Sequence, residues 1–134
     1  MGAWGCGAFD NDDSGDWLDL LQQASDASVI ADALQHVASF GEEYLEEPYS
    51  SYAIAAAEIV AALFGHPVAD FDETAQEWVN AHRSLAVTGL VPTALAALQR
   101  IRTNSELKEL WDDSPGAAHW YAVLDDISRR LSAK

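Results

Sequence analysis

An alanine-rich apolar stretch in the middle of the chain, residues 50–64, constrains the fold more than any other feature. It contains six alanines, and its isoleucine, valine, leucine and phenylalanine side chains cover every side of an α-helix. A helix that is apolar all round must be buried among other elements. We therefore predict a central helix that Ser50 caps and that Gly65, followed by Pro67, ends. Amphipathic neighbours are expected to wrap it and to leave the aspartates and glutamates facing water.

The flanking segments supply such neighbours, because their apolar residues recur at the i, i+3, i+4 spacing of amphipathic helices. These helices are predicted to begin near residues 13 or 14, 25 or 26, 71, 91 and 105, and after residue 114. The bundle has about six helices if the short segment 105–111 is joined to its neighbour, and seven if it is counted alone. The alternating β-branched runs of a sheet are missing. We expect a single all-α domain over residues 1–134, a compact bundle with an irregular, glycine-rich lead-in at residues 2–12.

Local patterns predict several helix ends and core contacts. Capping-box-like pairs are formed by Asp70 with Glu73 and by Thr103 with Glu106. Gly41 is expected to end the second helix as its C′ residue. The aromatic and leucine side chains expected to point inward are Trp17, Trp78, Trp120, Tyr44, Leu45 and Tyr49.

The charge of the chain is strongly negative and unevenly distributed. The formal net charge is −15, and no lysine or arginine precedes Arg83. Such a field disfavours nucleic acid and anionic membranes, whose phosphates need basic side chains. It favours a basic protein partner and speeds its capture, although a high negative charge can also serve solubility alone. The leading hypothesis is a non-enzymatic binding or inhibitor-type protein for a basic partner.

The residues at positions 10–16 offer a second hypothesis, a divalent-metal-binding enzyme or sensor. Its candidate ligands are Asp10, Asp12, Asp13 and Asp16. The order of oxygen-bearing residues resembles the start of a calcium loop, but the twelfth position holds Leu21 where a bidentate glutamate is needed. Helix capping and solvation are the competing interpretation of the same carboxylates.

Other chemistry finds little support in the sequence. The four histidines do not pair at helical spacing, so a zinc site would need distant residues to converge. Cys6 is the only cysteine, which excludes an intrachain disulfide and, with no signal peptide visible, indicates the cytoplasm. No cofactor and no catalytic residue are predicted. A third hypothesis is a homo-oligomer that buries Trp4, which glycines rather than a helix position.

The opening residues also carry a family resemblance. They read Gly-Ala-Trp-Gly-x-Gly-x-Phe-x-Asn-Asp, with the signature side chains Trp4, Phe9, Asn11, Asp12 and Trp17. Together with the Ala-Ala-Ala-Glu-Ile-Val-Ala-Ala-Leu string at 55–63, this resembles domain-of-unknown-function family 4259. The resemblance implies a bacterial, stand-alone, soluble protein. The family has no established activity, so the resemblance transfers no catalytic residues.

Overall fold

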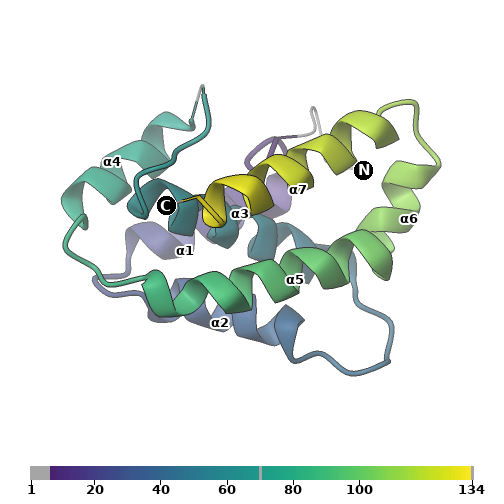
Figure 1. Ribbon diagram of the computed structural model, residues 1–134, viewed down its shortest axis with the longest axis horizontal. Helices are drawn as coiled ribbons and strands as arrows, with labels where there is room; N and C mark the ends of the chain where they lie inside the picture. Colours follow the sequence, from purple (N-terminus) through teal and green to yellow (C-terminus); the bar gives the residue numbers. More distant parts are fainter. Residues whose placement is uncertain (1–6, 70, 134) are drawn as a thin grey trace.

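The alanine-rich stretch forms the central helix of the molecule. The computed structural model describes residues 7–69 and 71–133, and in it this helix, α3, spans Glu47–Leu63. Every residue from Ala53 to Ala62 is buried. α3 contacts each of the other six α-helices (Figure 1). The prediction of a buried central helix is confirmed.

The remaining elements surround α3. They are α1 (Asp12–Gln22), α2 (Ser28–Ala38), α4 (Glu73–Ala81), the short 3₁₀ helix η1 (Thr88–Leu90), α5 (Val91–Thr103), α6 (Glu106–Asp112) and α7 (Ala117–Leu131). The described part of the chain contains no β-strand, so the all-α prediction is confirmed. The short segment after α5 is a separate helix, α6, which makes seven α-helices in residues 7–69 and 71–133. None of the described helices is long and apolar enough to cross a bilayer.

The helices cover α3 from several directions. α2 and α5 pack against each other and both pack on α3, while α7 contacts α3 and α5 (Figure 1). Trp17, Trp78 and Trp120 are all buried, which confirms that these tryptophans belong to the core. Small alanine side chains on α3 permit close approach, because the distance between packed helices depends on the side chains at the contact.

Three N-caps differ from the sequence predictions by two or three residues. α1 begins after Asn11, whose Oδ1 accepts the Ser14 N–H at 2.8 Å. α4 uses Asp72, and Asp70 lies outside the described residues. α6 uses Ser105 rather than the predicted Thr103. In each case a side-chain oxygen accepts the N–H three residues later, so the chemistry was expected and only the register was wrong.

The start of α3 corrects the prediction that Ser50 is its cap. The helix begins three residues earlier, with Pro48 in its first turn, and Ser50 is fully buried inside it. A residue from another helix takes over the capping role, because Glu106 Oε1 accepts the Glu47 N–H at 2.8 Å. The Glu106 N–H in turn donates to the Leu45 carbonyl at 2.9 Å. Such a cross-helix cap leaves no local sequence pattern.

The acidic loop between α2 and α3 is held by Arg100 of α5. Its guanidinium donates to the carbonyls of Phe40, Gly41 and Glu43 at 3.1, 2.7 and 2.9 Å. α2 ends at Ala38, so Gly41 is not its C′ residue. In the described residues the one positive-φ glycine is Gly65, which follows α3 as predicted.

Two of the aromatic residues predicted to point inward from this loop region do not do so. Tyr44 is 55% exposed and Tyr49 is 40% exposed, whereas Leu45 is buried as expected. The Tyr44 hydroxyl donates to Glu109 Oε2 at 2.9 Å, and the Tyr49 ring lies 4.4 Å from the His36 ring. Both tyrosines therefore have polar or aromatic partners at the surface.

Two buried serines near helix N-termini yield a paired prediction: Ser50 in the first turn of α3 and Ser105 at the N-cap of α6. Ser50 Oγ has no hydrogen-bond partner, so Ser50→Ala should raise the free energy of unfolding by about 1 kcal/mol. Ser105 Oγ accepts the Lys108 N–H and donates to the Ile101 carbonyl, so Ser105→Ala should lower it by about 1–2 kcal/mol. Urea denaturation of both variants measures the difference. Equal destabilisation by the two substitutions would contradict this description.

Candidate functional site

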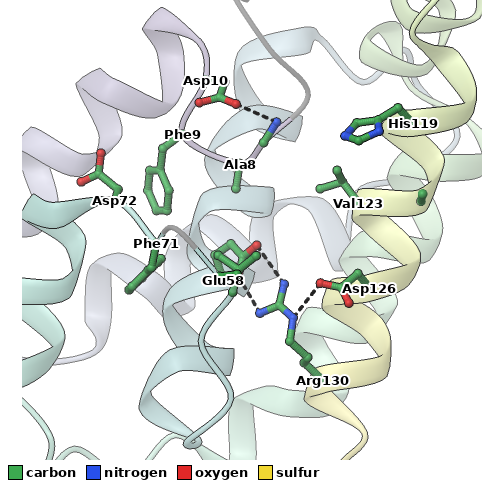
Figure 2. Close-up of a pocket in the computed structure, with 14 residues that line it drawn as sticks. Ala8, Phe9, Asp10, Glu58, Phe71, Asp72, His119, Val123, Asp126 and Arg130 are labelled. Carbon is green, nitrogen blue, oxygen red and sulfur yellow. Dashed lines mark hydrogen bonds and ion pairs between the residues drawn. The ribbon is translucent and has the colours of Figure 1, made fainter.

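A pocket beside the central helix is the main candidate site. Three segments far apart in sequence enclose it: the turn at residues 7–10, the α3–α4 connection and the outer face of α7 (Figure 2). Its volume is about 610 Å³. The apolar lining comprises Gly7, Ala8, Phe9, Val68, Ala69, Phe71, Ala122 and Val123. The polar lining comprises Asp10, Glu58, Asp72, His119, Asp126 and Arg130.

A buried ion pair joins the central helix to α7 at this pocket. Glu58 is 2% exposed and Arg130 is 8% exposed. Arg130 donates to Glu58 Oε1 at 2.8 Å and to Oε2 at 3.0 Å, a bidentate arrangement (Figure 2). The Arg130 Nε also donates to Asp126 Oδ2 at 2.8 Å. The expectation that the carboxylates face water is therefore wrong for Glu58.

The end of α3 supplies a further acceptor for the same guanidinium. Gly65 has φ +98°, which lets the chain reverse after the helix, and the His66 N–H bonds back to the Ala61 carbonyl at 2.9 Å. The His66 carbonyl then accepts from Arg130 at 3.0 Å. The glycine that ends α3 thus also directs a backbone oxygen toward Arg130.

The electrostatics of this group favour the charged forms of Arg130 and Asp126. Burial alone would lower the pKa of Arg130, but the hydrogen bonds and charges of Glu58 and Asp126 outweigh it and raise that pKa. Burial opposes ionisation of Asp126 too, yet its bonds to Arg130 and Arg129 lower its pKa. The pair is a charged structural link between α3 and α7.

The N-terminal edge of the pocket is a tight turn. The Asp10 N–H donates to the Gly7 carbonyl at 3.1 Å, and the Gly7 N–H donates to Asp10 Oδ2 at 3.0 Å. A Cβ at Gly7 would lie 2.7 Å from Asp10 Oδ2, so a larger residue here would force the Asp10 carboxylate away from its bond to the residue 7 N–H. Phe9 leaves the turn toward Phe71, with ring centroids 5.9 Å apart.

The four predicted metal ligands point to different surroundings. Asp10 bonds to Gly7, Asp12 and Asp16 are exposed on α1, and Asp13 lies against Glu47 of α3. In the described part of the chain no three Asp, Glu, His or Cys side chains are placed to hold one ion. The metal hypothesis stays a prediction.

Of the N-terminal signature residues, those that the structure describes have mainly structural roles. Asn11 caps α1, Asp12 lies in its first turn, where the helix dipole favours a negative charge, and Trp17 is in the core. Phe9 lines the pocket. Trp4 and Cys6, like the rest of residues 1–6, lie outside the described residues.

The histidines lie in four separate settings. His36 lies beside Tyr49 and Phe40, and His66 beside Phe64. His82, at the end of α4, stacks on Trp78 with ring centroids 4.0 Å apart, and its Nδ1 lies 2.8 Å from the Trp78 carbonyl oxygen. His119 lines the pocket from α7.

A second acidic group gathers at the start of α3. Partial burial, a hydrogen bond with Asp13 and the charges of Asp13 and Glu106 raise the pKa of Glu47 to about 7. Ser51 Oγ donates to Glu47 Oε2 at 3.0 Å, which opposes the shift. The general expectation that glutamates face water holds for the exposed Glu42, Glu43 and Glu46, but Glu47 is partly buried.

The buried ion pair can be tested with matched arginine substitutions. Arg130→Met leaves Glu58 buried without a partner and should lower the free energy of unfolding by about 3–5 kcal/mol. The double variant Glu58→Leu/Arg130→Met should recover to wild-type stability or above. Arg129→Met removes a neighbouring side chain that is 73% exposed and should cost less than about 1 kcal/mol. Similar losses for Arg129→Met and Arg130→Met in chemical denaturation would refute the buried link.

The Glu47 proton makes stability depend on pH. Its pKa rises from 4.5 to about 7 on folding, so the stability it contributes is fully present below pH 4.5 and is lost as the pH rises through 7. As the pH rises between these two values, the free energy of unfolding of Glu47→Gln should therefore increase relative to that of wild type. Glu46→Gln, an exposed neighbour with the same charge change, is the control. If the two variants follow the same curve, Glu47 holds no such proton.

Comparison with known proteins gives one family. The family model described as Domain of unknown function (DUF4259) matches residues 2–123. The match covers α1 to α6 and ends within α7, so Glu58 lies inside it and Arg130 beyond it. No curated protein and no solved structure matches the chain. Because the match spans nearly the whole sequence, the chain belongs to the DUF4259 family.

Proposed function

We propose that this protein is a non-enzymatic binding protein, of the inhibitor type, that recognises a basic protein partner through the acidic surface of α1, α2 and α4. The observation that carries this proposal is how the positive charges are used. Every lysine and arginine side chain in the described residues donates to a group of the protein itself, as at Arg100 and Arg130. None of the described lysine and arginine side chains forms an ion pair with a carboxylate of α1, α2 or α4.

The carboxylates of this surface come from three helices. Asp16 and Asp19 on α1, Asp32 on α2, and Glu73 and Glu77 on α4 are exposed. The ion pairs between described residues involve none of them. α1 contacts both α2 and α4, so the helices that carry these charges are neighbours (Figure 1). A one-signed surface of this kind attracts and orients a partner of opposite charge.

The test is capture of partners from the native host, followed by association kinetics with the purified partner. We expect a basic protein whose association rate falls at least tenfold between about 50 and 500 mM salt, because salt screens exposed charges. Asp16→Asn/Asp19→Asn should slow association several-fold. The control Glu42→Gln/Asp113→Asn removes the same charge from two exposed positions that do not belong to the acidic surface of α1, α2 and α4. Glu42 lies in the loop before α3, and Asp113 lies at the end of α6.

Three outcomes would overturn the proposal. They are capture of no basic protein, an association rate indifferent to salt, and equal slowing by the two double variants. The last result would mean that the partner responds to net charge alone and does not recognise this surface.

A further inference from the structure

The pocket beside α3 has the size and lining of a small-molecule site. Its volume of about 610 Å³ falls within the range of roughly 300–1,000 Å³ typical of such sites. Phe9 and Phe71 stand edge to face on one side, at an interplanar angle of 62°, and Val123 of α7 faces the cavity from the other side (Figure 2). Both phenylalanines are only partly buried, so ring surface is available to a ligand.

The charges around this apolar wall have one predominant sign. Four carboxylates and one guanidinium line the pocket, together with His119. The guanidinium of Arg130 is already bound to Glu58, to Asp126 and to the His66 carbonyl. An anionic ligand would therefore have to displace these bonds, whereas a cation meets unneutralised carboxylates.

Two of the carboxylates have binding capacity to spare. Asp10 uses Oδ2 to accept the Gly7 N–H at 3.0 Å, and Asp72 uses Oδ1 to accept the Ala75 N–H at 3.0 Å. The second oxygen of each has no hydrogen bond among the described residues. In Figure 2 the Asp72 carboxylate lies to the left of the Phe9 ring and the Asp10 carboxylate lies above it. Aromatic faces beside carboxylates are the setting in which proteins bind organic cations.

We propose that this pocket binds a small organic cation, an ammonium group carried on an apolar or aromatic body. The ammonium group lies between Asp10 and Asp72, and the body packs against Phe9, Phe71 and Val123. This site is separate from the acidic surface proposed to bind a basic protein, and either proposal can fail without the other.

The experiment uses amide NMR on the full chain with three probes. 2-Phenylethylammonium should produce saturable shifts at Gly7, Phe9 and Val123, with half-saturation at about 1 mM or below. 3-Phenylpropanoate has the same body with an anionic group, and methylammonium has the charge without the body. Both should bind at least tenfold more weakly. Equal binding of the anion, or no saturable shift at these amides with any probe, would overturn the proposal.

Matched variants separate the pocket from the general negative field. Asp10→Asn/Asp72→Asn keeps both backbone hydrogen bonds, since asparagine also caps, and should weaken 2-phenylethylammonium at least tenfold. Asp12→Asn/Glu73→Gln removes the same charge from neighbouring exposed positions outside the pocket and should change affinity less than twofold. Ala122→Phe, an exposed position of α7 that lines the cavity, should block binding sterically. Equal weakening by the two double variants, or full binding by Ala122→Phe, would refute the site.

Discussion

Burial of α3 on every side is the constraint on which the rest of the structure depends. Its residues from Ala53 to Ala62 leave no face for water, so six helices must be arranged around it. Removing that apolar surface from water drives the packing. The same burial puts Glu58 in the core, where a lone carboxylate is too costly to keep charged. α7 meets this requirement because Arg130 reaches Glu58 with both terminal nitrogens.

The sequence predicts the fold class and the central helix, because both depend on hydrophobic spacing that can be read directly. It does not predict the partner of Glu58. The sequence did contain one signal. A single carboxylate inside a helix that must be buried needs a cation as its partner. Arg130 lies three residues after Ile127, a helical spacing that puts it next to the apolar face of its own helix. The helix dipole also favours a cation in the last turn of a helix, so the position of Arg130 in the sequence does not by itself indicate burial. Only the packing of α3 against α7 shows that Arg130 is buried.

The errors at helix ends and at the site have a common cause. Asn11, Asp72 and Ser105 cap by local bonds, so sequence reasoning came within a few residues of them. The cap of α3 comes from Glu106, and the raised pKa of Glu47 comes from burial and from Asp13; Glu106 and Asp13 are both distant in sequence from α3. The pocket likewise joins three separate segments. Contacts of this kind arise only when the helices pack, so no local pattern encodes them.

Residue-resolved hydrogen–deuterium exchange tests the central claim most directly. If α3 is buried on every side, the amides from Ala53 to Ala62 exchange only through global unfolding and are the slowest in the protein. Their exchange free energies should equal the free energy of unfolding measured with denaturant, and those of α4 and α6 at the periphery should be lower. Exchange of the α3 amides as fast as those of α4 would contradict the account.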